Sequence, residues 1–116
     1  MNTLAQWHAV RFLDRRVQML KAVAHPVRLC VIAALADRPM HVNALAEGLE
    51  VPQPIISQQL RILRMMGLVR THRLGGLAVY ELAEPHLHDL LQCLDRCCAD
   101  STRRAASRPR LVKPRG

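Results

Sequence analysis

The order of elements along residues 43–82 limits the fold more than any other feature of this chain. Two amphipathic helical segments, separated by a proline-containing turn, are followed by two β-prone segments around Gly75 and Gly76, where a hairpin needs positive φ angles. The helical segments cover residues 43–49 and 55–67, the turn 51–54, and the β-prone segments 68–72 and 77–82. A short helix, a tight turn, a longer helix and a glycine-tipped hairpin predict a winged helix-turn-helix.

Further helices are predicted on both sides of this unit. Residues 4–23 repeat apolar side chains at helical spacing, a second helix opens at Pro26 and stops before Pro39, and a last one runs from near Pro85 to about Ala99. The chain is 50% apolar but only 3% aromatic, which favours packed helices over a β-sandwich. We predict a mainly α fold with a small β-hairpin wing over residues 1–100, and a disordered basic tail over residues 101–116.

The last predicted helix carries a stripe of leucines on one face, formed by Leu87, Leu90, Leu91 and Leu94. A lone small domain could not bury such a stripe, because little of its own surface is left to cover it. The pattern predicts a homodimer.

No segment of the chain has the pattern of a membrane anchor or a secretion signal. The longest uncharged apolar run, residues 29–36, falls short of the roughly 20 residues that a membrane-spanning helix needs. Charged residues between Arg11 and Arg16 stand where a signal peptide would be apolar. We expect no membrane partner and a cytoplasmic location, where the four cysteines are thiols or metal ligands rather than disulfides.

Positive charge is concentrated in two parts of the sequence. The net charge is +8, residues 51–80 contain four arginines and no acidic residue, and residues 101–116 contain six basic residues. Residues 81–100 reverse the sign, with five acidic residues and one arginine. The basic middle and the basic tail favour an anionic partner such as nucleic acid.

The longer helix of the predicted unit has the two faces that a DNA-reading helix requires. Ile56, Leu60 and Leu63 are expected to face inward, while short polar side chains remain outside. Glutamine suits adenine, serine suits phosphate or base edges, and arginines on the hairpin suit the DNA backbone. The predicted DNA-binding residues are Gln53, Ser57, Gln58, Gln59, Arg61 and Arg64 on the helix, and Arg70, His72 and Arg73 on the hairpin.

Several segments together resemble one family of bacterial regulators. They are Leu20-Lys21-Ala22-Val23-Ala24-His25-Pro26-Val27-Arg28-Leu29, Leu45-Ala46-Glu47, Pro54-Ile55-Ile56-Ser57-Gln58-Gln59-Leu60, Leu63-Arg64 and Gly67-Leu68-Val69. Over roughly residues 15–100 the chain resembles the ArsR/SmtB family of dimeric, metal-responsive repressors. The resemblance implies a homodimer joined by the first and last helices, with two recognition helices in successive major grooves of an inverted-repeat operator. Ile55 departs from the family pattern of Thr or Ser, which puts one phosphate contact in doubt.

The residues at the family's two metal sites indicate which effector this chain could bind. The first family site is a Cys-x-Cys pair, for which this chain has His41-Val42-Asn43, so its soft-metal form is expected to be absent. The second site is matched by Glu84, His86, Cys97 and Asp100, with cysteine in place of the second histidine. His86 and Cys97 share a helix face about 16 Å apart, so the site closes only between two antiparallel helices of a dimer. Zn²⁺ suits these ligands, and Cd²⁺, Co²⁺ or Ni²⁺ could compete.

A rival site uses the thiols alone. Cys93, Cys97 and Cys98 cluster at the end of the last predicted helix, which suits arsenite, Cu(I), oxidation or persulfide formation. Cys30 is expected to be a small buried core residue. The third alternative is that these cysteines only pack in a dimer interface and that the protein has no effector.

Two other classes of protein fit the sequence less well. The sequence contains no glycine-rich phosphate loop, no nucleophile elbow and no paired carboxylates in an evident cleft, so we expect no enzymatic activity. A winged helix that binds only protein is the remaining alternative, and it would show no salt-dependent affinity for DNA.

Overall fold

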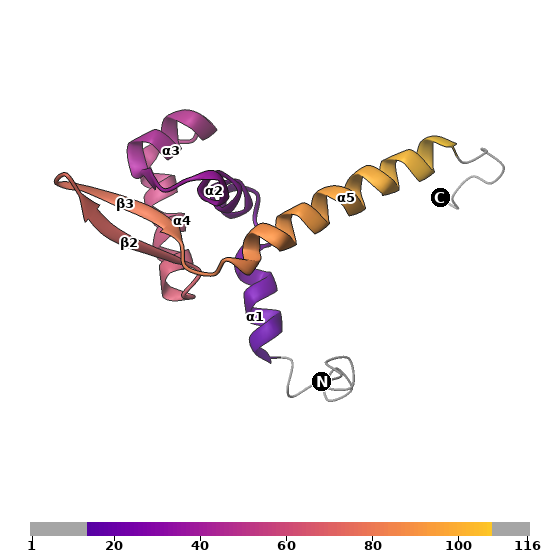
Figure 1. Ribbon diagram of the computed structural model, residues 1–116, viewed down its shortest axis with the longest axis horizontal. Helices are drawn as coiled ribbons and strands as arrows, with labels where there is room; N and C mark the ends of the chain where they lie inside the picture. Colours follow the sequence, from indigo (N-terminus) through magenta and orange to yellow (C-terminus); the bar gives the residue numbers. More distant parts are fainter. Residues whose placement is uncertain (1–13, 108–116) are drawn as a thin grey trace.

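The computed structural model describes the backbone of residues 14–107 and the side chains as far as Ser101. The predicted first helix is confirmed from Asp14 onward, and its residues 4–13 lie outside the described part. The elements shown in Figure 1 are α1 (Asp14–Val23), α2 (Pro26–Asp37), β1 (Met40–His41), α3 (Val42–Leu49), α4 (Gln53–Met65), β2 (Val69–Leu74), β3 (Leu77–Leu82) and α5 (His86–Ser107).

The three strands form one antiparallel sheet in the order β1-β3-β2. Strands β2 and β3 make the expected hairpin, and Gly75 and Gly76 adopt positive φ angles of 59° and 85° at its turn. Strand β1 pairs Met40 with Tyr80, which the sequence did not predict, because two residues are too short to show alternation. The sheet and the helix pair α3–α4 confirm the winged helix-turn-helix.

The core is aliphatic and lies between the helices and the base of the hairpin. Leu45, Ile56 and Leu63 have no exposed surface, and Leu60 and Leu68 are almost fully buried. These side chains come from α3, from α4 and from the segment that follows α4, so the inner face of α4 is fixed by apolar packing.

Helix α2 is strongly apolar and packs against the core. No single described helix is long and apolar enough to cross a membrane, and α1 with α2 reaches that composition only as a pair bent by 88°. Val31 and Ile32 of α2 have no exposed surface, and Leu35 is 4% exposed. The apolar side of α2 is therefore occupied by the core of this domain.

Histidines begin two of the helices. The Nδ1 atom of His25 accepts hydrogen bonds from the backbone N–H groups of Val27 and Arg28, and Pro26 follows it in the first turn, as predicted. The Nδ1 atom of His41 accepts from the Asn43 N–H at 3.2 Å. The start of α3 is therefore capped by His41 rather than by Asn43, because the helix begins one residue earlier than predicted.

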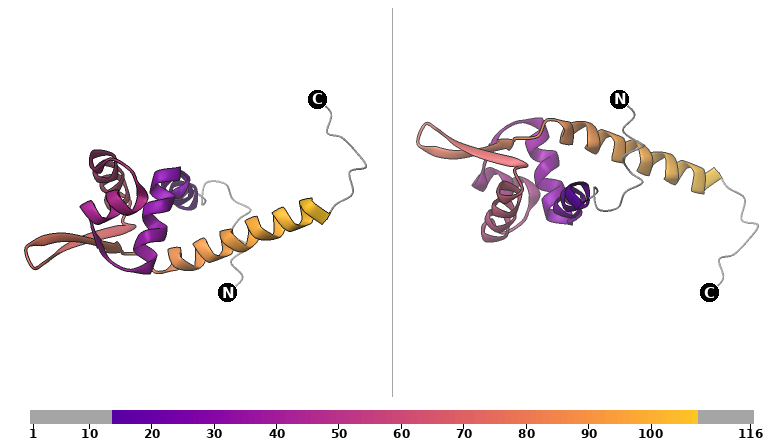
Figure 2. Two further views of the ribbon diagram at one scale, coloured as in Figure 1. Left: turned by 90° about the horizontal axis from the view of Figure 1, so that it is seen from above. Right: turned by 90° about the horizontal axis from the view of Figure 1, so that it is seen from below.

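Helix α5 leaves the body of the domain as a long rod (Figures 1 and 2). Leu87 is buried, Leu90 and Leu91 pack against the core of the same chain, and Leu94 remains 39% exposed. The domain thus buries most of the leucine stripe by itself, which corrects the premise that a single chain could not do so. From Gln92 to Ser101 every residue is exposed.

The far end of α5 also differs from the prediction. The helix continues past Ala99 to Ser107, so residues 101–107, for which composition predicts disorder, are helical. Alanine and arginine are strong helix formers, and no glycine or proline occurs between Pro85 and Pro109. The remaining residues 108–116 lie outside the described part of the chain.

Candidate DNA-binding interface

A three-residue turn redirects the chain between α3 and α4. Glu50 adopts a left-handed conformation, with φ 56° and ψ 44°, and the N–H of Val51 donates to the Ala46 carbonyl at 3.1 Å. The Pro52 carbonyl then accepts from the N–H of Ile55 at 3.0 Å and opens α4. Helix α4 therefore begins at Gln53, earlier than predicted, because a proline is tolerated in the first turn.

The outer face of α4 carries polar side chains opposite a buried apolar face. Ile56, Leu60 and Leu63 are buried, as predicted from their spacing. The exposed residues include Gln53, Ser57, Gln58, Arg61 and Arg64. The Gln53 Nε2 atom donates to the Ser57 Oγ atom at 3.2 Å, so these two side chains are aligned along one turn of the helix.

Gln59 does not lie on this outer face. Its side chain is only 8% exposed, and its Oε1 atom accepts a hydrogen bond from Arg28 Nη1 at 2.8 Å. The expectation that Gln59 is available to DNA is therefore not met. The physical reason is that Gln59 precedes Leu60 on the inner side of α4, where a polar partner from α2 accommodates it.

The basic side chains of the wing are held in different ways. The Arg73 Nη1 atom donates to the Gly76 carbonyl at 2.8 Å, which ties this exposed side chain to the hairpin turn. Arg70 and His72 both lie close to Glu81 on β3, with Arg70 Nη2 3.6 Å and His72 Nδ1 3.2 Å from its carboxylate. The wing therefore offers fewer uncompensated positive charges than its sequence indicates.

Glu81 is a candidate functional residue that sequence reasoning missed. It lies just beyond the acid-free segment of residues 51–80, yet the hairpin pairs it directly with Arg70. The signal that could have found it is the two-residue turn at Gly75 and Gly76, because this turn sets the register of every cross-strand pair.

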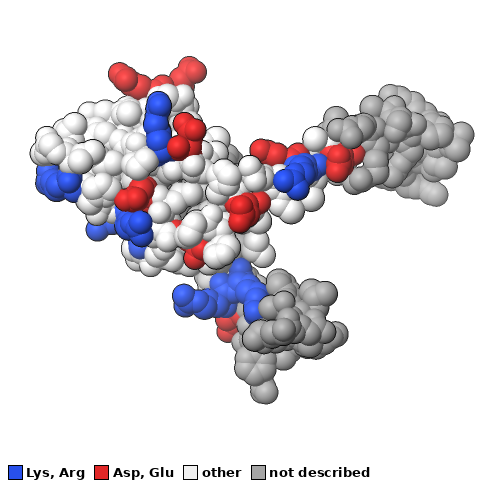
Figure 3. Space-filling view, viewed as in Figure 1, with Lys and Arg blue, Asp and Glu red and all other residues white. Residues whose placement is uncertain are grey.

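Charge is unevenly spread over the described surface. In Figure 3, acidic groups gather over the outer end of α3 and along α5, and blue groups lie over the hairpin and around α1. This agrees with the separation of a basic middle and an acidic end in the sequence. On the face drawn in Figure 3, the hairpin is therefore more basic than α3 or α5.

The predicted metal residues at the start of α5 are in contact. The Glu84 carboxylate accepts from the His86 backbone N–H at 3.1 Å, and its Oε1 atom lies 2.6 Å from His86 Nδ1. This side-chain hydrogen bond raises the pKa of His86 above its ordinary value and lowers the pKa of Glu84. The pair is solvent-exposed and fixed at one end of α5.

The other predicted ligands lie farther along the same helix. Cys93, Cys97 and Cys98 are all exposed. Asp100 is also exposed, one residue before the last residue whose side chain is described. Within the part of a single chain that the structure describes, no three His, Cys, Asp or Glu side chains are grouped to hold a metal. Cys30 is exposed on α2, so the prediction that it is a buried core residue is wrong.

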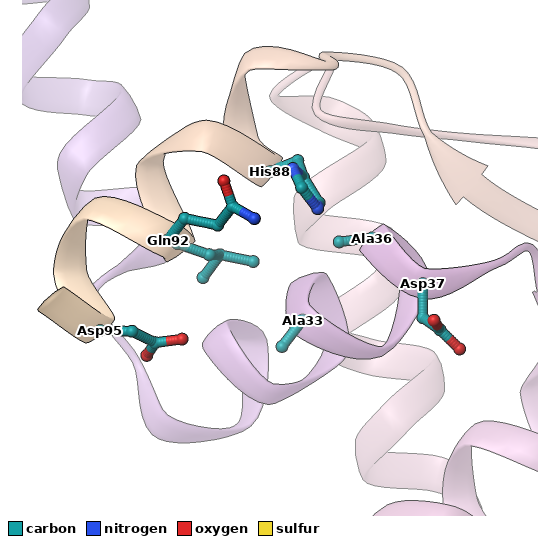
Figure 4. Close-up of a pocket in the computed structure, with 7 residues that line it drawn as sticks. Ala33, Ala36, Asp37, His88, Gln92 and Asp95 are labelled. Atoms are coloured by element: carbon teal, nitrogen blue, oxygen red, sulfur yellow. The ribbon is translucent and has the colours of Figure 1, made fainter.

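A hollow of about 460 Å³ lies between α2 and α5, and the sequence did not indicate it. Figure 4 shows Asp37 and Asp95 on opposite sides of it, with Ala33, His88 and Gln92 between them. The hollow is open to solvent, and both polar and apolar side chains line it. Because its two carboxylates lie on opposite sides, it does not provide a closed set of metal ligands.

The fold and the outer face of α4 define a winged helix-turn-helix protein. Residues 25–71 match the family described as bacterial regulatory protein, arsR family. The biofilm growth-associated repressor of Xylella fastidiosa is 36% identical over 76 residues, which cover 66% of this chain and 67% of that protein. The chain belongs to the ArsR family.

Other relatives are similar over the same region. The transcriptional repressor SmtB of Mycobacterium tuberculosis is 40% identical over 75 residues, but these span only 56% of its length. Among solved structures, the repressor BigR of Xylella fastidiosa is 32% identical, with a TM-score of 0.66 over 78% of this chain and 90% of BigR. A homodimeric winged helix-turn-helix DNA-binding domain from Mycobacterium bovis has a TM-score of 0.69 at 26% identity, over 86% of this chain and 92% of that domain.

Proposed function

We propose that this protein is a transcriptional repressor that binds double-stranded operator DNA through α4 and the wing. The observation that carries the proposal is the outer face of α4, where Ser57 and Gln58 are exposed opposite fully buried leucines and isoleucine. Glutamine can pair with adenine in the major groove, and serine can contact a base or a phosphate. Several relatives, including SmtB and BigR, are named repressors, which supports the same role here.

A homodimer supplies the two recognition helices that an inverted repeat requires. Val17 and Leu20 on α1 are 40% and 53% exposed, and Leu94 on α5 is 39% exposed. Burying these apolar side chains against a second copy is favourable, and the similar domain from Mycobacterium bovis is described as homodimeric. Two-fold symmetry then places two copies of α4 about one helical turn of DNA apart.

The proposed DNA binding is tested by selection from a random pool of DNA duplexes with the purified full chain. We expect enrichment of an inverted repeat and an affinity that falls steeply with salt, because arginines displace counterions from phosphates. Failure to enrich any sequence, with binding that does not respond to salt, would favour a winged helix that binds only protein.

For the effector, we propose a divalent metal held between two copies of α5. His86 of one copy and Cys97 of the other supply nitrogen and sulfur, and Glu84 and Asp100 add oxygen, a donor set that suits Zn²⁺. The hydrogen bond that His86 Nδ1 donates to the Glu84 carboxylate supports the proposal, because it leaves Nε2 as the metal-binding atom. Ligands from both chains would fix the angle between the protomers and so change the spacing of the recognition helices.

A second candidate effector acts through the cysteines alone. The exposure of Cys93, Cys97 and Cys98 on α5 favours it, since arsenite or an oxidant can reach all three thiols. Titration of the reduced protein with Zn²⁺ and separately with arsenite separates the candidates, when thiolate absorption and release of the selected duplex are followed together. Release by Zn²⁺ alone supports the mixed site, release by arsenite alone supports the thiols, and release by neither leaves a repressor without these effectors.

A further inference from the structure

Arg28 joins three helices through one guanidinium group. It lies in the first turn of α2, where its Nε atom donates to the Ala22 carbonyl at 2.5 Å and its Nη2 atom to the Lys21 carbonyl at 3.3 Å. Both carbonyls belong to the last turn of α1. The third nitrogen, Nη1, donates to Gln59 Oε1 on α4 at 2.8 Å. The planar fork of the guanidinium fixes the directions of all three hydrogen bonds.

Gln59 is the only buried polar side chain among the residues whose burial is described. The other inward side chains of α4, such as Ile56 and Leu60, make apolar contacts, which keep this face of the helix buried but give no directional bond. A hydrogen bond to a buried amide is directional, and losing its partner is costly. The bond to Arg28 is therefore well suited to set how far α4 is turned about its own axis.

Rotation of α4 decides where its outer residues point. Successive residues of an α-helix are about 100° apart, so the orientation of Gln59 also sets the orientation of the neighbouring Gln58 and Ser57. These two side chains are exposed on the face proposed to meet base edges. A base contact depends on donor and acceptor directions, so a small turn of α4 weakens it.

We propose that the Arg28–Gln59 hydrogen bond is a positioning device, which holds α4 in register with α1 so that Ser57 and Gln58 meet the bases. Gln59 is thus a positioning residue and not a base-contacting one. The proposal rests on the proposed DNA-binding function. It also gives α1, whose Val17 and Leu20 form part of the proposed dimer contact, a direct connection to the recognition helix.

The experiment compares affinities for the duplex selected by the wild-type chain and for a scrambled duplex at one salt concentration. Gln59→Leu keeps the size and burial of the side chain but removes the acceptor, and we expect the ratio of the two affinities to fall about tenfold. Gln59→Glu still accepts from Arg28, and we expect it to keep the ratio. The matched control, Ile56→Val, removes one methylene from the same helix face and lowers the Tm without altering the ratio.

The outcomes separate this proposal from the proposed function. If the wild-type chain selects no sequence, the proposed function fails and the positioning role falls with it. If the wild-type chain selects an operator but Gln59→Leu keeps the ratio, or lowers it no more than Ile56→Val does, only the positioning role is overturned. Should Gln59→Leu not fold, Arg28→Lys provides the same test, because one ammonium cannot replace the three-way fork, and an unchanged ratio in that variant overturns the proposal.

Discussion

Arg70 and Glu81 face each other across the wing, with the Arg70 Nη2 atom 3.6 Å from the Glu81 carboxylate. Their side chains are 63% and 25% exposed, so the pair contributes little to folding stability. Its consequence concerns DNA, because one negative charge lies beside two wing residues, Arg70 and His72, that we propose for phosphate contact. A phosphate has to replace Glu81 as the partner of Arg70.

Glu81→Gln should therefore strengthen DNA binding. We expect a gain of about two- to fivefold on all duplexes, since an exposed ion pair is worth up to ~1 kcal/mol and phosphate contacts carry no sequence information. The affinity is measured by fluorescence anisotropy on the selected and scrambled duplexes. Asp89→Asn makes the same change of charge on α5, away from the hairpin. An equal gain in affinity in that control would show that the effect does not come from the position of Glu81 beside Arg70.

The same pair shows what the sequence could and could not reveal. Periodicity found the inner face of α4 and the hairpin, because both depend on local patterns. The polar character of Gln59 led to its being placed outside, although its spacing from Ile56 and Leu63 puts it on the inner face. The spacing of one helix does not show the partner, here Arg28 of α2, that allows a polar side chain to be buried. Glu81 was overlooked because it lies outside the acid-free segment and meets Arg70 only once the hairpin has formed.

The candidate effector site also has one part that the sequence could predict and one part that it could not. The contact between Glu84 and His86 is local and could be anticipated from their spacing. Whether Cys97 meets His86 depends on a second copy of α5, and the described part of one chain contains no complete ligand group. The burial of Leu87 could not be predicted either, because it depends on tertiary packing, which covers most of the leucine stripe within one chain.

Leu20→Lys should convert the protein to a monomer. Leu20 is 53% exposed on α1, and a lysine there would bring a charge into the proposed contact between two copies. Sedimentation at micromolar concentration measures the change of mass. Leu77→Lys, at a position 55% exposed on the hairpin, is the control that should keep the mass of a dimer. A wild-type chain that sediments as a monomer would contradict the proposed dimer directly.

Substitutions on α4 and on the wing should have different effects on DNA recognition. Gln58→Ala should reduce the preference for the selected operator by about 1–3 kcal/mol, the usual cost of a lost base contact. Arg73→Ala should weaken all duplexes alike and flatten the dependence on salt, since a phosphate contact is lost. Both are measured over a salt series on selected and scrambled duplexes. The proposed roles are wrong if the two variants show the same loss of preference.

The pair of Glu84 and His86 predicts a dependence on pH. Because Glu84 raises the pKa of His86, the protonated imidazole is favoured in the folded chain. While Glu84 is ionised, the stabilisation is complete below the ordinary histidine pKa of about 6.5 and is lost as the pH rises through the raised value. An NMR titration of the His86 ring should show its pKa return toward the ordinary value in Glu84→Gln. Asp89→Asn should lower it less, because Asp89 contributes only a weaker coulombic effect. An equal change in both variants would contradict the assignment.

Three substitutions on α5 distinguish the candidate effectors. Cys97→Ser should abolish release of DNA by any effector while leaving DNA binding intact, because serine keeps the size of cysteine but is a poor ligand for a soft or borderline metal. His86→Ala should abolish release by Zn²⁺ in the mixed site and leave a thiol-only response unchanged. Cys93→Ser should do the reverse. Each variant is titrated with Zn²⁺ and with arsenite while the bound duplex is followed, and the wild-type chain, which must respond to one of them, is the reference. Release that persists in all three variants would mean that the effector binds elsewhere and that the cysteines of α5 only pack between protomers.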